Sequence, residues 1–394
     1  MANPPTDKNN GTFVTDDIAF SVLSKLPLKS MKRFSSACKS WSQEFEKPSF
    51  LQKFFNNLVS KSHDDDDDVK PLFNINDRLY LRSGDNFQNE KELDMNLPSP
   101  FDDRHFHILG SAIQGILCLY IADNQKNVIL WNPDVSGQYR VLPTDYAEDL
   151  GYPYEDFVAN FQVHGFGYDP VNHDFKVIQL VNYYGYYDEG DDDETNSFWQ
   201  VYCLRTNNWT KLNIPSGHQI PFLQCNPNGL EVYLDGFCHW LGRVEAFGHV
   251  YLVSFNLTNS RYSVLATPVD KDVYESSLKL VVLNGSVAMI TQHNDPMSFS
   301  ISILGQIGVQ ESWTKLFNVA SLPSFKDPIS AGKKGVIFFK GDENNGRVAC
   351  FDLTTGVIEK EIDFEEEVDI QQIVFYKKSD KLLSMKRKKN TSHH

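Results

Sequence analysis

The sequence predicts a mainly β protein with a small α-helical head at its N-terminus. Between residues 13 and 58, apolar residues recur every three or four positions, which is helical spacing. From residue 71 onward, short β-branched and aromatic runs alternate with turns of Gly, Asn, Asp and Pro, which is typical of strands and tight turns. The chain has 394 residues and is 41% apolar, which suffices for one large domain and a smaller one.

Charge and composition restrict the classes of partner and the location. The formal net charge is −15, and eleven carboxylates lie in two runs, 64–68 and 188–194. Nucleic-acid binding requires an excess of Lys and Arg on the binding face, so we expect no nucleic-acid partner. No apolar stretch is long enough for a membrane span or resembles a signal peptide, so we expect no membrane association. The expected location is cytoplasmic and/or nuclear, with the six scattered cysteines reduced.

Three helices are expected in the head. Asp16 favours a helix N-terminus, and the helix that it starts ends at Pro27. Ser30 can cap a second helix, and Pro48 restarts the chain into a third. The resulting unit, residues 13–58, is too small to bury all its apolar side chains, so they must face either a partner or the rest of the chain.

Three further segments follow the head. Residues 59–70 form an acidic stretch, expected to be a solvated linker, because a flexible run of carboxylates has no fixed geometry for a metal ion. The β body is expected to span 71–385. A basic tail, 386–394, ends the chain, and the cluster "KRKK" at its start is typical of an exposed nuclear-import signal or of a tail that only aids solubility.

The β body is repetitive. Five units each begin with an apolar run led by Gly and close with a strand, a polar turn and a strand, as in "GILCLYIADNQKNVILWNPDVSGQYRVLP". The closing residues recur about every 45 to 70 residues, and they are Tyr139, Trp209, Tyr262, Trp313 and Ile358. A sixth unit can combine "LFNINDRLYLRS" near the start of the body with "QQIVFYKKSDKLLSM" at its end, which removes exposed sheet edges. The pattern predicts a β-propeller of six blades, with a two-sheet β-sandwich as the alternative.

No motif in the chain predicts catalysis. The sequence has no G-x-S-x-G elbow, no P-loop, no H-E-x-x-H and no Cys pair at zinc-ligand spacing. Cys238 and His239 are neighbours, and neighbours on a strand point to opposite faces, so they cannot easily form a nucleophile–base pair. We expect no enzyme activity, no catalytic residue, no cofactor and no metal site.

Two parts of the chain resemble a known plant family. The segment "FVTDDIAFSVLSKLPLKSMKRFSSACKSWSQEFEKPSF" is similar to an F-box, with "KLPLKSMKRF", "CKSW" and "PSF" in the correct order. The body resembles the F-box-associated, kelch-like domain through "GILCL", "LWNP", "GFGYDPVNHDFKV", "GFCHWLG" and "FDLTTG". The chain departs from the F-box pattern where Leu-Pro is usual and Val14 and Thr15 stand, although Thr15 can still act as an N-cap.

The resemblance implies a function in the Ubl conjugation pathway. It implies a substrate-recognition subunit of a Skp-cullin-F-box ubiquitin ligase complex, which binds a Skp-type adaptor and, through it, the cullin. The kelch-like domain would bind an unknown protein substrate for ubiquitination and degradation. The alternative is a non-degradative binding propeller with weak adaptor engagement. The adaptor surface that the resemblance implies consists of Val14, Thr15, Ile18, Val22, Leu23, Leu26, Pro27, Leu28, Cys38 and Trp41.

The β body also holds a candidate substrate-binding segment. "NYYGYYDEGDDDE", residues 182–194, has four tyrosines followed by an acidic cluster. Tyrosines are favoured interface anchors, so the segment is either part of a recognition surface or a solvated loop. The candidate substrate-binding residues are Tyr183, Tyr184, Tyr186 and Tyr187. The neighbouring carboxylates favour a basic partner through electrostatic steering.

Overall fold

The structure is a computed structural model that describes parts of the first 57 residues and most of the chain from residue 68 to residue 383. The described residues are 21–26, 41, 43, 45, 47, 49–50, 53–54, 57, 68–84, 87–101, 105–144, 157–185, 196–214, 220–222, 231–243, 248–269, 274, 277–294, 297–309, 312–320, 322, 324–341, 346–364, 368–380 and 383.

The chain divides into two compact units, residues 1–63 and 64–394. In the first unit, most of the described positions are helical, and Phe45, Phe50 and Phe54 are buried. The ring centroids of Phe45 and Phe50 lie 4.8 Å apart. The Asn57 side-chain amide donates a hydrogen bond of 2.8 Å to the Ser24 hydroxyl. The three expected helices and their limits stay predictions, because most of their residues lie outside the described part.

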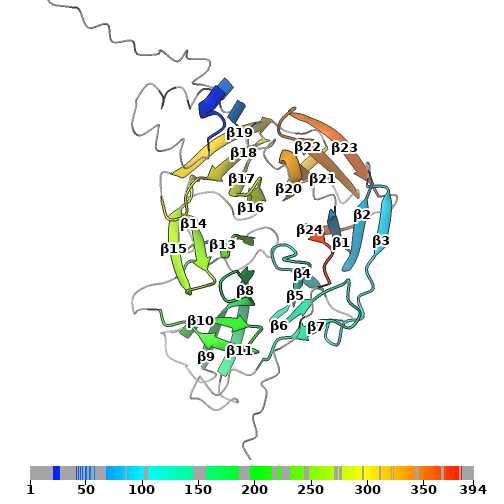
Figure 1. The fold of residues 1–394 in the computed structure, drawn as a ribbon, viewed down its shortest axis with the longest axis vertical. Helices are drawn as coiled ribbons and strands as arrows, with labels where there is room; N and C mark the ends of the chain where they lie inside the picture. The colour runs from blue at the N-terminus through cyan, green and yellow to red at the C-terminus, as the bar shows by residue number, and fades with distance from the viewer. Residues whose placement is uncertain are drawn as a thin grey trace, which may run out of the picture. The chain divides into compact units, whose positions relative to one another are not determined.

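The second unit is a six-bladed β-propeller, which confirms the predicted fold class over the alternative sandwich (Figure 1). Within the described residues, its strands form six sheets of four strands each. The strands are β1 (Val69–Ile75), β2 (Arg78–Ser83), β3 (Asn89–Glu92), β4 (Phe106–Ile108), β5 (Leu117–Ile121), β6 (Asn124–Trp131), β7 (Tyr139–Val141), β8 (Phe157–Asp169), β9 (Asp174–Gly185), β10 (Asn196–Cys203), β11 (Asn208–Lys211), β12 (Glu231–Leu234), β13 (Phe237–Gly242), β14 (Tyr251–Asn256), β15 (Arg261–Ala266), β16 (Leu278–Leu283), β17 (Ser286–Asn294), β18 (Met297–Leu304), β19 (Trp313–Ala320), β20 (Phe325–Ala331), β21 (Val336–Gly341), β22 (Arg347–Asp352), β23 (Val357–Asp363) and β24 (Ile370–Lys377).

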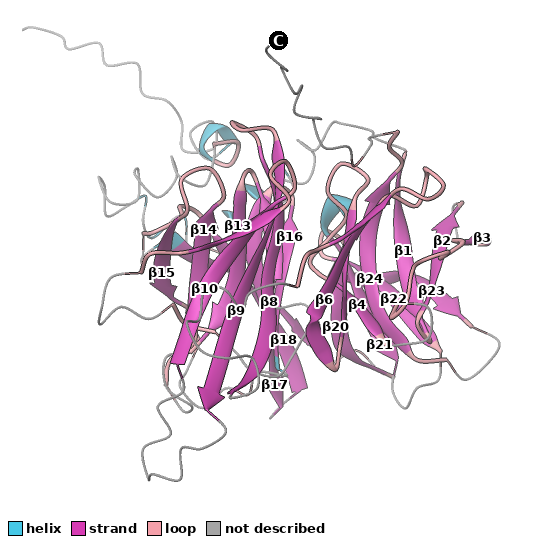
Figure 2. Cartoon of the chain, turned by 90° about the horizontal axis from the view of Figure 1, so that it is seen from below, coloured by secondary structure: helices cyan, strands magenta, loops and turns pink. Residues whose placement is uncertain are grey.

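The ring closes by pairing its two ends. Five sheets use four consecutive strands, whereas the sixth has the order β24-β1-β2-β3, which we call the closing sheet. β24 and β1 pair antiparallel from Val69 opposite Lys377 to Ile75 opposite Ile370. The expected joining of the two ends is thereby confirmed. Seen from the side, the strands of neighbouring blades run along the ring axis (Figure 2).

The five closing residues of the repeats occupy equivalent places. Each lies on the outermost strand of its sheet and pairs with an apolar residue near the end of the third strand. The pairs are Tyr139 with Trp131, Trp209 with Tyr202, Tyr262 with Phe255, Trp313 with Leu304 and Ile358 with Phe351. Such cross-strand pairs stabilise the outer edge of a blade, which explains why the sequence repeats them.

The hydrophobic core lies between neighbouring blades. On β24, Val374 and Tyr376 pack with residues of the β4–β7 blade, whereas Ile370 and Ile373 pack with residues of the β20–β23 blade. Successive side chains point to opposite faces of a strand, which separates Ile373 from Val374 and Tyr376, and the register shift between Gln372 and Ile370 places Ile370 on the face of Ile373. Each blade is therefore stabilised by two neighbours.

A buried ion pair fixes the turn between β8 and β9. The buried Asp169 carboxylate accepts hydrogen bonds from Lys176 Nζ at 2.8 Å and from the Asn172 side-chain amide at 2.7 Å. It also accepts one from the hydroxyl of Thr258, at 2.9 Å, on the next blade. Burial alone would raise the pKa of Asp169, but the hydrogen bonds from Lys176 and Asn172 outweigh burial and hold the pKa well below its usual range. The motif "GFGYDPVNHDFKV" is thus a structural link between two blades.

Two histidines are buried in the two blades that this ion pair links. The His164 ring lies 5.0 Å from the Trp199 ring and 5.8 Å from the Trp240 ring. His239 Nδ1 lies 2.9 Å from the Ser254 hydroxyl. Burial lowers the pKa of His164 to about 3 and that of His239 to about 4. Both imidazoles are therefore neutral in the folded protein near neutral pH.

We predict that Asp169→Asn destabilises the propeller by about 3 to 5 kcal/mol, because it leaves the Lys176 ammonium buried without a counter-charge. The double variant Asp169→Asn/Lys176→Met should recover part of this loss, since no unpaired charge then stays buried. Urea unfolding followed by tryptophan fluorescence measures both, with Asp235→Asn on an exposed turn as the control. Equal losses in the single and double variants would contradict this role of the ion pair.

We also predict that acid destabilises the propeller through the buried histidines. Their folded-state pKa values lie below the ordinary 6.5, so their contribution to stability is complete above pH 6.5 and is lost as the pH falls toward about 3 for His164 and about 4 for His239. His164→Phe should therefore lose less stability than the wild type between pH 6.5 and pH 4. Urea unfolding at each pH tests this, with the exposed His249→Gln as the control. An unchanged pH profile for His164→Phe would refute the prediction.

Candidate functional site

A pocket of about 870 Å³ lies where the closing sheet meets the β4–β7 sheet. Three groups of residues line it: the β1–β2 turn, described residues between the end of β3 and the start of β4, and the β5–β6 turn. All three lie at the same end of the ring, because successive strands of each sheet are antiparallel. We call this end the pocket end of the propeller.

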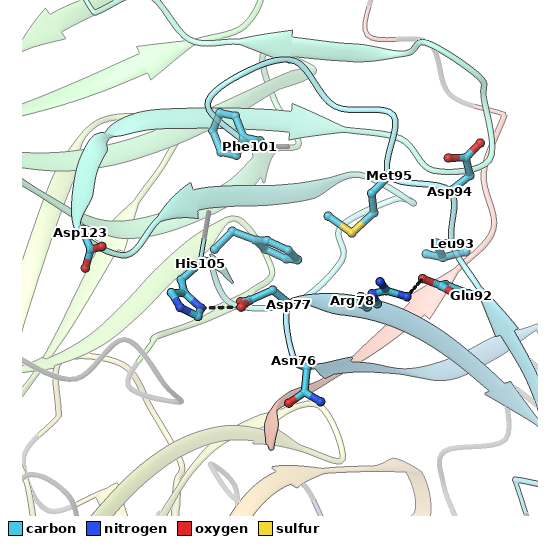
Figure 3. Close-up of a pocket in the computed structure, with 11 residues that line it drawn as sticks. Asn76, Asp77, Arg78, Glu92, Leu93, Asp94, Met95, Phe101, His105 and Asp123 are labelled. Atoms are coloured by element: carbon cyan, nitrogen blue, oxygen red, sulfur yellow. Dashed lines mark hydrogen bonds and ion pairs between the residues drawn. The ribbon is translucent and has the colours of Figure 1, made fainter. Parts of the chain in front are cut away.

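The floor of the pocket is apolar. Leu93, Phe101 and Phe106 are buried in the hydrophobic core between the two blades. Met95 is half-buried against the same cluster, and its side chain reaches over the middle of the pocket (Figure 3). The floor therefore belongs to the packed core, and Met95 is its one partly exposed apolar side chain among the described lining residues.

The tip of the β1–β2 hairpin brings Asp77 into the pocket. Ile75 pairs with Arg78, so Asn76 and Asp77 form a two-residue turn with positive φ angles of 50° and 60°. Asn and Asp tolerate this left-handed conformation better than other residues with a side chain. The Asn76 side-chain oxygen accepts a hydrogen bond of 3.1 Å from the backbone amide of Asp369, which holds the tip beside the start of β24.

The rim of the pocket is acidic. It carries the carboxylates of Asp77, Glu92, Asp94 and Asp123. The two basic residues among the described lining residues are already engaged, since His105 Nδ1 lies 2.5 Å from Asp77 Oδ2 and Arg78 lies 3.5 Å from Glu92 (Figure 3). Among the described residues, Asp94 and Asp123 have no ion-pair partner, and Asp77 Oδ1 is enclosed without a hydrogen-bond donor.

His107 lies behind this rim on β4, half-buried. Burial lowers the pKa of His107, whereas the Asp77 and Asp123 carboxylates act in the opposite direction. The net effect keeps the imidazole neutral near neutral pH, so His107 does not offset the charge of the rim. The described lining of the pocket therefore keeps its negative balance.

The predicted substrate tyrosines belong to another blade. Tyr183 lies near the end of β9, which is the second strand of its sheet and so ends at the pocket end, as β1 and β5 do. Its ring is half-buried, 6.1 Å from the ring of Phe198. The side chain of Tyr184 lies outside the described part, as do Tyr186 and Tyr187. The structure does not bring the four tyrosines together in a described site, and their role stays a prediction.

Four of the ten predicted adaptor residues are described. Val22 is 57% exposed, and Leu23, Leu26 and Trp41 are half-buried. The other six lie outside the described part, namely Val14, Thr15, Ile18, Pro27, Leu28 and Cys38. One exposed apolar side chain is common on any protein surface. The adaptor surface therefore stays a prediction.

The described residues contain no group of three or more His, Cys, Asp or Glu side chains placed to hold a metal ion. Nor does any helix among them have the length and apolar character to cross a membrane. Cys238 packs in the core cluster that also contains Trp240, and burial raises the pKa of its thiol. A thiol held protonated in this way is a poor nucleophile.

Reasoning from the sequence missed the pocket. The turn at Asn76–Asp77 is visible as a break between two apolar runs, and Asp123 likewise lies in the two-residue turn between β5 and β6. Acidic residues at turns are common, however, and nothing in the sequence pairs these two turns. The missing signal is the contact between the closing sheet and the next blade, which only the folded ring supplies.

Comparison with known proteins gives a family match over most of the chain. The family described as "F-box associated beta propeller domain" matches residues 81–387. F-box protein At5g10340 of Arabidopsis thaliana is 23% identical over 64% of this chain, and the match spans only 57% of that relative's length. F-box/kelch-repeat protein At3g23880 of the same plant is 21% identical over 78% of this chain and 80% of its own. F-box protein CPR1, also from Arabidopsis thaliana, is 22% identical over 86% of this chain and 81% of its own.

Proposed function

The chain belongs to the family of proteins with an F-box associated beta propeller domain, and from this membership we propose that it is a substrate-recognition subunit of a Skp-cullin-F-box ubiquitin ligase. In this proposal, residues 13–58 form an F-box that binds a Skp-type adaptor, and the adaptor connects the chain to the cullin. The propeller binds the target protein. The observation that carries the proposal is the family match over 81–387, together with relatives that are F-box proteins.

The proposed role requires no catalytic residues in this chain. Other subunits would transfer ubiquitin, and the chain would contribute by holding the target close to them. Binding two partners at once converts an encounter in solution into an intramolecular one with a high effective concentration. The rigid ring of blades suits this role, because it keeps the binding loops of one end in fixed positions.

Adaptor binding also agrees with the physical limits of the first unit. A unit of about 45 residues buries too little apolar surface to be stable by itself. Phe45, Phe50 and Phe54 form a small buried cluster among its described residues, whereas Val22 stays largely exposed. A partner that covers Val22 and the neighbouring Leu26 would add the apolar burial that the unit lacks.

We predict that Val22→Asp/Leu26→Asp abolishes co-purification of the chain with a Skp-type adaptor, because a buried unpaired carboxylate costs several kcal/mol. The matched control is Val171→Asp, at an exposed Val in the β8–β9 turn. Circular dichroism should show an unchanged β signal in both variants. Capture of adaptor by the double variant at the wild-type level would show that Val22 and Leu26 do not form the docking surface.

A non-degradative binding protein is the second candidate, because Thr15 replaces the Pro that is usual in an F-box. Protein turnover separates the two. Proteins captured by the chain while proteolysis is blocked should have longer half-lives in cells that carry Val22→Asp/Leu26→Asp than in cells that carry the wild type. Equal half-lives, with wild-type adaptor capture confirmed, would favour the non-degradative role.

A further inference from the structure

The acidic pocket holds charges that the described chain does not neutralise. Asp94 and Asp123 lie on opposite sides of the pocket, and Met95 and the Asp77–His105 pair lie between them (Figure 3). Two exposed carboxylates therefore flank a middle in which Met95 is apolar and the Asp77–His105 pair is polar. A concave surface of one sign concentrates its electric field and attracts ions of the opposite sign.

The enclosed oxygen of Asp77 also lacks a donor. Asp77 Oδ2 is bound by His105, whereas Oδ1 has no hydrogen-bond partner among the described residues and no access to solvent. An enclosed carboxylate oxygen without a donor is costly. Because Oδ1 is enclosed, a ligand in the pocket would reach the exposed carboxylates of Asp94 and Asp123 and not this oxygen.

We propose that this pocket binds an extended segment of the target protein in which two basic side chains flank an apolar one. The basic groups would contact the carboxylates of Asp94 and Asp123, and the apolar side chain would pack on Met95 and the floor. Arg fits better than Lys, because its planar guanidinium donates several hydrogen bonds at fixed angles and its stem packs on apolar surface. That the bound segment belongs to a target protein rests on the proposed receptor function.

The dimensions support a peptide segment as the occupant. A volume of about 870 Å³ lies within the range of about 300 to 1,000 Å³ that small-ligand sites span, so it holds a few side chains and not a folded domain. A metal ion is a poor alternative, because no three described His, Cys, Asp or Glu side chains converge on one point.

The basic tail of this chain is a less suitable occupant. β24 runs away from the pocket end, and the chain after it is fastened at the other end of the ring. There the Asn132 side-chain amide donates a hydrogen bond of 3.0 Å to the Ser379 carbonyl, and the Ser379 amide donates one of 2.9 Å to the Asp134 carboxylate. Ser379, seven residues before the tail begins, therefore lies across the propeller from the pocket.

Peptide binding tests the proposal. The probe is a fluorescently labelled peptide, Gly-Arg-Gly-Leu-Gly-Arg-Gly, and fluorescence anisotropy with the full-length chain gives its Kd. Replacing both arginines by citrulline, which keeps the shape and removes the charge, should weaken binding about tenfold, as should 0.5 M salt. Replacing the leucine by serine should weaken it less. Equal affinity for the arginine and citrulline peptides would overturn the proposal.

Substitutions of the pocket residues test whether the peptide binds at the pocket. Asp94→Asn/Asp123→Asn should weaken peptide binding about tenfold, which corresponds to about 0.7 kcal/mol for each of the two exposed pairs. The matched control is Asp235→Asn/Glu359→Gln, which removes the same charge from exposed positions elsewhere on the propeller and should leave Kd unchanged. Met95→Gln should weaken binding of the leucine peptide but not of the serine peptide. Equal weakening by both double variants would mean a non-specific charge effect and would overturn the assignment.

Two further outcomes keep this inference distinct from the proposed function. If the peptide does not bind but the chain captures the Skp-type adaptor, the pocket assignment fails and the ligase role stands. If the peptide binds at the pocket but the adaptor is not captured, the pocket assignment stands and the ligase role fails.

A truncated chain tests the tail as the occupant. If only a chain cut after residue 383 binds the peptide, the tail occupies the pocket, and the proposal of a target segment is overturned.

Discussion

Pairing between β1 and β24 is the interaction on which the rest of the propeller depends. A propeller has no single central core, and each blade is stable because it packs against two neighbours. If the two ends did not pair, the sheet of β1–β3 would lose its inner strand, and both neighbouring clusters would lose the residues that β24 contributes. Unpaired strand edges would then be exposed to other chains. Closure therefore determines both stability and solubility.

The same closure builds the pocket. The β1–β2 hairpin and the segment after β3 belong to the first residues of the ring, and the Asp369 amide that holds the tip at Asn76 belongs to the last. The β4–β7 blade completes the pocket from the other side. The pocket thus lies beside the seam of the ring, and its shape depends on the register of β1 with β24. A shift of one residue would point Leu72 and Phe73 at the wrong neighbours.

Much of the fold could be predicted from the sequence, because the blades use local signals. Turns such as Asp235–Gly236 and Asn284–Gly285, with positive φ angles, separate runs of the right length for strands, and the outer-strand residues repeat from blade to blade. Closure could be predicted as well, since a ring leaves no strand unpaired. The pocket could not, because Asp77, Asp94 and Asp123 come from two blades and carry no local pattern. Substrate binding by the four tyrosines stays a prediction. The Tyr183 ring lies beside the Phe198 ring, and the side chains of Tyr184, Tyr186 and Tyr187 lie outside the described part.

Two kinds of carboxylate illustrate how this propeller separates stability from recognition. Asp169 is buried, paired with Lys176 and bonded to the next blade, so removing its charge leaves another charge unpaired in the interior. Asp94 and Asp123 are exposed, and exposed charges contribute little to folding because solvent screens them. Their charge therefore imposes little folding cost and stays available to a ligand. A rim of this kind can change its charge pattern between related proteins without endangering the ring, whereas the turn at Asp169 cannot.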